Sequence, residues 1–396
     1  MRKIRHLFGF MLIVMVFQTC KDPFEARSGL KNTNFLVVEG FINVGQGVTR
    51  IKLSRVTPLN QVSELIPETS ASIFIEDDEN AEYALHVVSD GVYESDLLDL
   101  DIVSDYRLRI ELEGKTYFSE YTTPATTPPI DSINWKLDQD NFVNIYANTH
   151  DPNNGTLYYK WEYEEVWEVR STYKTDWEWE NGVARLRPKD ESRSMYYCWK
   201  YNHNTDFLIA TSAKLTSDMI SLFPLTKFYI TDSRLGWRYS ILVKQRALTL
   251  QEFEYLQLMK KNTSDLGSFF DSQPSQQTGN IHCTSSDEPV IGYIGSYVSQ
   301  SKRIFLKRDI ISDFPYVTPC GDLPADVALT DPNLGTFLRY WIPLEPIFVT
   351  VEGDDAPVVV GLRIARDYCT DCRINAGTAP KPDFWVAEDE ADEEVE

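Results

Sequence analysis

The stretch YRLRIEL at residues 106–112 decides the fold class, because apolar and charged residues alternate along it without interruption. Successive side chains of a β-strand point to opposite faces, so this pattern gives one apolar face and one charged face. Similar alternation occurs at residues 50–53 and 71–75. These segments are therefore predicted to be half-buried antiparallel strands.

The residues around these strands predict a complete β-domain. Residues 35–42 form a nearly continuous apolar run, as expected of a central strand, and the pairs Asp90-Gly91 and Glu113-Gly114 supply turns. An antiparallel β-sandwich of about seven short strands accounts for residues 31–122.

A second domain follows a proline-rich break. Residues 123–129 have no periodicity and contain prolines, so they are expected to be a stiff linker that cannot continue a sheet. Strand character resumes at 142–147 and 158–169. We predict a second antiparallel sandwich over 130–308, so the fold class is mostly β, with two consecutive immunoglobulin-like or fibronectin-III-like domains.

One amphipathic helix, residues 249–262, is inserted in the second domain. Thr249 and Glu252 have capping-box spacing. Apolar residues then recur every three residues at Leu250, Phe253, Leu256 and Met259. We expect this stripe to pack on the second sandwich, and a partner-binding helix is the alternative. Residues 309–386 are interrupted by prolines and are expected to be an irregular, cysteine-containing segment.

The first 19 residues read as a signal peptide, with a cationic start and an apolar run. The run is shorter than the roughly 20 residues that a membrane-spanning helix needs. Cys20 stands where a bacterial lipoprotein signal presents the thiol that receives the lipid, and an ordinary secretory leader is the alternative. Residues 20–30 would then form the tether of a lipid-anchored protein, which contacts the membrane through that anchor.

The chain is strongly acidic, with a formal net charge of −22. Such a surface repels nucleic-acid phosphate, so a nucleic-acid partner is not expected. Acidic residues crowd the tail at 387–396, which we interpret as solvated and disordered, with calcium binding or docking as the alternative.

Signals for catalysis are weak along the whole chain. The pairs Ser171/Lys174 and Ser299/Lys302 have the spacing of a serine acylase, but the companion motifs are missing. The acidic clusters at 77–79 and 99–101 lack the ligand spacing of a known calcium loop and fit turn residues better. No catalytic residue, metal site or cofactor is predicted.

Five cysteines remain if Cys20 carries a lipid. They are Cys198, Cys283, Cys320, Cys369 and Cys372. Thiols of an exported chain form disulfides in an oxidising compartment. We expect Cys369 or Cys372 to join Cys320 or Cys283, and one thiol to stay free. A zinc or redox role for the Cys-x-x-Cys pair is the alternative.

Aromatic residues crowd the stretch 158–199, which contains five tryptophans and six tyrosines. At least half of them should fill a core, because alternate residues of a strand face inward. Trp177 and Trp179 lie on one face beside the turn residues Asn181-Gly182, which suggests an exposed hairpin tip. We predict that these two tryptophans contact a ligand or receptor, the alternative being that they cover the domain's own sheet.

The order of several short motifs resembles the domain of unknown function (DUF) family 4249. The motifs are Cys20-x-x-Pro23-Phe24, Leu36 to Gly40, Gly91-Val92-Tyr93, Tyr106-Arg107-Leu108, Pro129 to Ile133, Cys369-x-x-Cys372-Arg373 and Pro382-Asp383-Phe384-Trp385. The resemblance spans almost the whole mature chain. It implies an outer-membrane lipoprotein of Bacteroidota-type bacteria, often encoded beside a TonB-dependent receptor, and it supplies no catalytic residues.

From these observations we expect a non-enzymatic lipoprotein, anchored through Cys20 in the outer membrane and exposed at the cell surface. It would capture or present ligand for a TonB-dependent transporter. An envelope enzyme acting on glycan or peptide and a structural or adhesion lipoprotein are the two alternatives.

Overall fold

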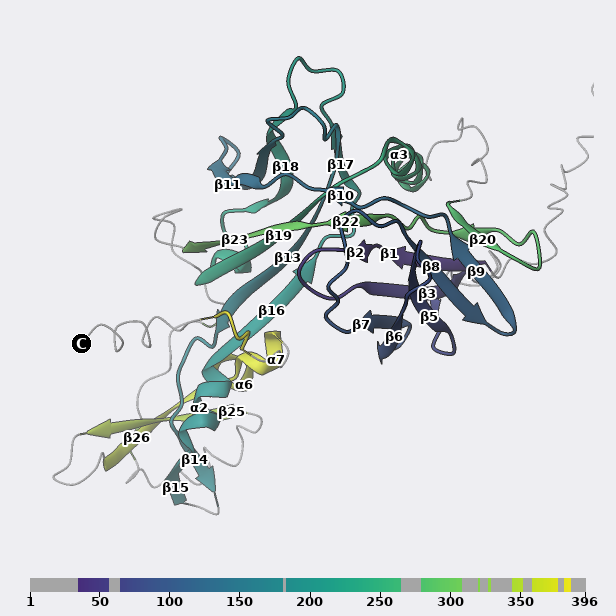
Figure 1. Ribbon diagram of the computed structural model, residues 1–396. Helices are drawn as coiled ribbons and strands as arrows, with labels where there is room; N and C mark the ends of the chain where they lie inside the picture. The colour runs from purple at the N-terminus through teal and green to yellow at the C-terminus, as the bar shows by residue number, and fades with distance from the viewer. Residues whose placement is uncertain are drawn as a thin grey trace, which may run out of the picture.

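The computed structural model describes residues 35–56, 65–180, 183–264, 279–307, 320, 327–328, 344–351, 358–376 and 381–385. The protein is mostly β-structure in several sheets, as the alternation predicts (Figure 1). The predicted leader, Cys20, the tether to residue 30 and the acidic tail lie outside the described residues. Within the described ranges, no helix is long and apolar enough to cross a membrane.

One continuous sheet forms what we call the first body. Its strands, in the described part of the chain, are β1 (Leu36–Gly40), β3 (Arg50–Val56), β4 (Leu65–Pro67), β5 (Ser72–Asp77), β6 (Glu82–Ser89), β7 (Val92–Ser95), β8 (Tyr106–Leu112), β9 (Lys115–Ser119), β20 (Ile281–Cys283) and β21 (Val290–Ile291). They pair in the order β20-β9-β8-β5-β6-β7-β3-β1-β21, and β4 pairs with β3. The predicted turns connect β6 to β7 and β8 to β9, where Gly91 and Gly114 adopt φ values of +70° and +76° that glycine accepts without strain.

The two end strands of this sheet come from one short segment. β20 pairs with β9, and β21 pairs with β1. The buried Asn280 side chain bridges the segment by donating to the Ile294 carbonyl at 2.7 Å and accepting from the Ile294 N–H at 2.8 Å. A Cβ at Gly279 would lie 1.4 Å from the Gly292 oxygen, so only glycine fits there. Residues 281–291 fall within the range 130–308 predicted for the second domain, but their strands belong to the sheet of the first body, so that assignment is wrong for this segment.

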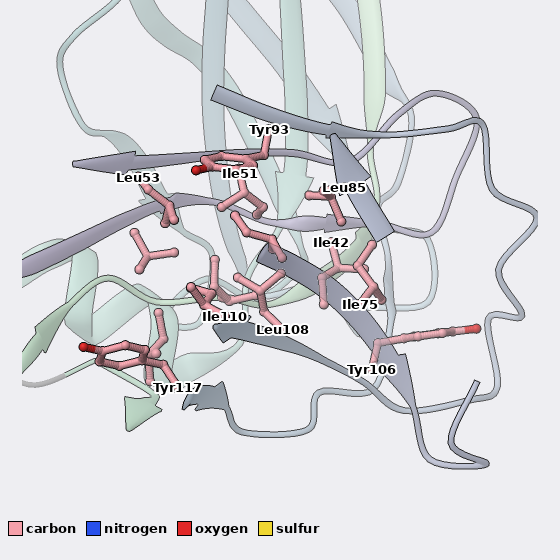
Figure 2. Packing of buried hydrophobic residues seen from close by; sticks show 14 of the residues in the cluster. Ile42, Ile51, Leu53, Ile75, Leu85, Tyr93, Tyr106, Leu108, Ile110 and Tyr117 are labelled. Carbon is pink, nitrogen blue, oxygen red and sulfur yellow. The ribbon is translucent and has the colours of Figure 1, made fainter. Parts of the chain in front are cut away.

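The core of the first body lies inside this curved sheet. Alternate residues of β8 are buried, as its sequence pattern predicts. Figure 2 shows Ile51, Leu53 and Tyr93 on one side of the core and Leu108 and Ile110 on the other. Ile42 of β2, which belongs to a separate three-stranded sheet, is part of the same core, so the two sheets pack together.

The predicted linker at 123–129 is part of a sheet. β10 (Ala125–Thr126) pairs in parallel with β22 (Ser296–Val298), which also pairs with β2 (Ile42–Asn43). The expectation that this stretch cannot continue a sheet is wrong. Its prolines flank the two pairing residues and do not occupy them, so the backbone groups of β10 remain available.

Two further sheets form what we call the second body. One contains β11 (Ile130–Leu137), β12 (Phe142–His150) and β18 (Met219–Tyr229). The other contains β16 (Tyr197–His203), β13 (Tyr158–Arg170), β19 (Arg238–Ala247) and β23 (Gln300–Lys307), with β17 (Leu208–Thr211) beside β13; the short helix η1 (Ser233–Leu235) precedes β19. Their apolar side chains share one core, to which Ile145, Trp161 and Ile241 belong.

The predicted helix is confirmed as α3 (Leu250–Ser264), and the Thr249 oxygen accepts from the Glu252 N–H at 3.1 Å. Phe253 packs against Tyr158 of the second body, with ring centroids 4.9 Å apart, as expected for the apolar stripe. On another side of the helix, Tyr255 meets Tyr293 at 5.8 Å. The helix therefore touches both the second body and the returning segment that closes the first.

The remaining elements lie at the end of the second body that is farther from α3 and the first body (Figure 1). They are the hairpin β14 (Trp177–Glu180) and β15 (Val183–Leu186), α2 (Lys189–Tyr196), β24 (Val327–Ala328), β25 (Leu344–Val351), β26 (Val358–Arg366), α6 (Asp367–Thr370) and α7 (Cys372–Ala376). β24, β26 and β25 form an antiparallel sheet. The C-terminal segment is thus more regular than its prolines suggest.

Candidate functional site: a charged junction

A buried glutamine fixes the predicted linker to the second body. Gln245 of β19 accepts a hydrogen bond from the Trp161 indole at 2.7 Å. Its amide nitrogen donates to the Pro128 carbonyl and to the Thr149 hydroxyl, both at 2.9 Å. The Ala247 N–H donates to the Thr127 hydroxyl at 2.9 Å. Because buried polar groups require partners, this network holds residues 127–128 in one place.

The next residue of β19, Arg246, joins the two bodies. Its guanidinium carbon lies 4.7 Å from the ring centroid of Phe41, which directly precedes β2, and 5.4 Å from that of Tyr297 in β22. Only 7% of Arg246 is exposed. A cation over aromatic faces is stabilised by their quadrupoles, more so where water is excluded.

Carboxylates approach Arg246 from the other side. Its nitrogens lie 3.6 Å from Glu252 of α3 and 3.8 Å from Glu162 of β13. Glu162 also pairs with Lys160 at 2.7 Å. We call Lys160, Glu162, Arg246 and Glu252 the junction cluster; it draws on β13, β19 and α3.

Three members of the junction cluster have shifted pKa values, and burial contributes to each shift. Burial raises the pKa of the Glu252 carboxyl, and Arg246 and Lys160 offset only part of that rise. Burial and the neighbouring Arg246 lower the pKa of Lys160. Burial alone would raise the pKa of Glu162, but Lys160 and Arg246 outweigh it and lower the pKa to about 2.

Two carboxyl groups with opposite pKa shifts resemble an acid–base pair. However, Glu252 is only 1% exposed, so no polymeric substrate reaches it. Arg246 Nε, Glu252 Oε2 and Tyr297 Oη are buried without a hydrogen-bond partner among the described residues. Charges held in this way cost stability, so the arrangement is better explained as a titratable joint than as a catalytic centre.

Glu252→Gln tests this interpretation through pH. The pKa of Glu252 in the folded protein lies above its ordinary value of 4.5, so the ionised form is disfavoured on folding. The wild type should therefore be most stable relative to the variant below pH 4.5 and lose that advantage as pH rises through the raised pKa. Between pH 4 and pH 8, the melting temperature of the variant should rise by a few degrees relative to that of the wild type. Glu254→Gln, an exposed change on the same helix, is the control and should show no such trend. If melting temperature depends on pH in the same way for all three proteins, Glu252 does not act as a titratable group of the junction.

The aromatic stretch 158–199 mostly fills cores. Trp161 and Trp167 belong to the core of the second body, and Trp199 packs with Trp385. Trp177 lies on the predicted hairpin, paired with Leu186, and is half-buried. The Trp179 side chain lies outside the described residues. The predicted binding role of Trp177 and Trp179 therefore stays a prediction.

Two disulfides hold the C-terminal segment. Cys198 of β16 joins Cys372 of α7, and Cys320 joins Cys369 of α6. Cys283 is free. These bonds confirm the expected bridge from Cys369 or Cys372, the expected partner of Cys320 and the expected free thiol. No sequence pattern pairs Cys198 with Cys372.

A tryptophan near the C-terminus also returns to the second body. The buried Trp385 indole donates to Glu168 Oε2 at 3.4 Å, and its ring lies 5.8 Å from Phe305 of β23. The Cys198–Cys372 bond and this contact therefore attach α7 and Trp385 to the second body.

The weak catalytic motifs have structural explanations. The Ser171 hydroxyl donates to the Tyr173 carbonyl, and Lys302 donates to the carbonyls of Ile130 and Asp131. Asp77 accepts backbone N–H groups of its own turn. In the described part of the chain, no group of three or more histidine, cysteine or acidic residues could hold a metal ion.

The fold and the site define a β-rich protein of two bodies, joined through a charged junction and held at its C-terminal part by disulfides. Residues 21–303, more than half of the chain, match the model of the domain of unknown function DUF4249, so the protein belongs to this family. The match ends before Cys369 and Trp385, so the C-terminal motifs lie outside it. No curated protein matches the chain.

Proposed function

We propose that the protein is a lipid-anchored binding protein of the bacterial outer membrane, exposed at the cell surface, which captures ligand for a TonB-dependent receptor. The two disulfides carry this proposal among the structural observations, because such bonds persist in an oxidising compartment outside the cytoplasm. The leader, the position of Cys20 and the family membership support the same location.

The immunoglobulin-like description of the two domains is also part of this proposal. It is supported in the second body by one core shared between the sheet β11-β12-β18 and the sheet β16-β13-β19-β23. Such a sandwich is a rigid scaffold, and loops and hairpins at its ends commonly carry binding residues.

Isolation of the protein from native membranes tests the proposal. We expect an outer-membrane β-barrel receptor to co-purify and to be identified by mass spectrometry. Failure to recover a receptor, together with turnover of a glycan or peptide library, would support the enzyme alternative instead.

Substitution of Trp177 and Trp179 by alanine locates the binding surface. Tryptophans at the centre of an interface often contribute about 2 kcal/mol or more, so receptor recovery should fall by at least about tenfold. The melting temperature should change little if the pair faces a partner. The half-exposed Trp237, substituted in the same way, is the matched control and should leave recovery unchanged. A double variant that unfolds would show that the pair covers the protein's own sheet, and one that binds as before would show that the binding surface lies elsewhere.

A further inference from the structure

The first body exposes apolar side chains at two separate places. Leu65 and Ile66 of β4, with Val87 and Val88 of β6, are each about half exposed, between 49% and 53%. We call these four residues the tether-side patch. Exposed apolar clusters on a soluble surface mark contacts with partners or membranes.

Strand pairing brings β4 and the end of β6 together, so the tether-side patch lies at one end of the sheet, with Leu65 and Ile66 on its opposite faces. β7 pairs with the first half of β3, and β4 pairs with its second half, so both lie on the same side of β3. The turn between β6 and β7 abuts β4, since a Cβ at Gly91 would stand 3.0 Å from the Pro67 Cβ. The end of β6 and the strand β4 are therefore neighbours.

The chain enters the first body at this end. Leu36, the first residue of β1, pairs with Arg55 beside β4, and the Val56 N–H donates to the Phe35 carbonyl at 3.1 Å. The residues between Cys20 and Phe35 span at most roughly 50 Å when fully extended. From its entry, β1 leads to β2 and the junction, so the second body lies beyond the other end of this strand.

The other apolar place is a loop at the opposite end of β3. Leu97 and Val103 are each 78% exposed there, in the segment DLLDLDIVSD at residues 96–105, which contains four aspartates. It follows β7, whose last residue, Ser95, donates to the Thr49 carbonyl just before β3 begins. Around the tether-side patch, by contrast, Arg55 pairs with Glu68 and Glu113. The patch end thus has a cation that offsets part of its acid, whereas the loop has four aspartates and no cation. Uncompensated acid near a lipid headgroup is unfavourable, so the loop is the less compatible end.

We propose that the tether-side patch rests on the lipid bilayer to which Cys20 is anchored, with the second body pointing away from the membrane. This inference rests on the proposed lipidation of Cys20 and adds an orientation to it. A lipid anchor alone limits only how far the protein can move from the membrane. Apolar side chains that enter the membrane interface near the anchor also fix the angle of the protein relative to the membrane.

Full-length lipidated protein in phosphatidylethanolamine–phosphatidylcholine vesicles tests the orientation. An environment-sensitive fluorescent amino acid is placed at Ile66 in one sample and at Val103 in another. We expect blue-shifted emission and quenching by brominated lipid at residue 66, and water-like emission at residue 103. Protein that does not sediment with vesicles would overturn the lipid anchor and this inference with it. Protein that sediments but shows equal emission at both positions would overturn the orientation alone.

A second measurement uses exposed residues whose substitution the fold tolerates. With the probe at Leu65, Ile66→Ser combined with Val88→Ser should reduce quenching by at least about twofold while sedimentation is retained, because these side chains supply apolar area for the interface. Leu97→Ser combined with Val103→Ser is the matched control and should leave quenching unchanged. Equal quenching in both double variants would contradict contact through the tether-side patch.

Discussion

Cys20→Ala should release the protein from membranes and abolish its labelling by a fatty-acid probe. Each buried methylene of an attached lipid contributes about 0.8 kcal/mol to membrane binding, so loss of the acyl groups removes the anchor entirely. In the described ranges no helix replaces it, since none is long and apolar enough to span a bilayer. Fractionation followed by immunoblotting would measure the release.

Cys283→Ala is the control for this variant, because Cys283 is the thiol left free by the two disulfides. It should keep both the label and the membrane location. Equal membrane retention of the Cys20 and Cys283 variants would contradict the lipoprotein proposal and favour an ordinary secretory leader.

Local patterns predict the elements that local physics determines. Alternation at 106–112 predicts β8, since a strand with one buried face needs period two. Thr249 and Glu252 predict the start of α3, since a capping oxygen satisfies a free N–H there. Turn residues at 90–91 and 113–114 likewise mark the hairpins of the first body. Each of these features depends on residues that are near one another in sequence.

Long-range pairing is not visible in such patterns. β20 and β21 have ordinary strand composition, and no local signal assigns them to strands more than 160 residues earlier in the chain. The pairing of the linker is hidden for a related reason, because prolines in a segment predict that it does not pair along its whole length. Two residues between prolines are sufficient for β10.

The junction cluster could be predicted only in part. Lys160 and Glu162 alternate with the buried Trp161, which by itself suggests a solvated face. Glu252 stands at the helix position that favours an acid for capping reasons alone. Glu252 is buried because α3 and the returning segment cover this face of β13 and β19, which is a tertiary effect, whereas Glu162 stays partly exposed.

Loss of the Cys198–Cys372 bond should lower the free energy of unfolding more than any other predicted change in the described residues. The bond joins residues 174 positions apart, and the Cys320–Cys369 bond joins residues 49 apart. A cross-link restricts the unfolded chain more when the loop is longer, so the chain-entropy model gives about 5 kcal/mol for the first and about 4 kcal/mol for the second. Because the shorter loop lies within the longer one, these values are upper limits, and we expect about 2–5 kcal/mol for the first bond.

Urea unfolding of paired Cys→Ala variants would measure both losses. We expect Cys198→Ala with Cys372→Ala to lower the unfolding midpoint more than Cys320→Ala with Cys369→Ala. Cys283→Ala, which removes no cross-link, should lower the midpoint least. Peptide mapping without reductant should recover both linked pairs from the wild type. Free thiols at Cys369 and Cys372, or zinc bound to them, would contradict the bridges. A reversed order of the two losses would instead show that native contacts such as Trp385 with Glu168, rather than restriction of the unfolded chain, hold the C-terminal segment on the second body.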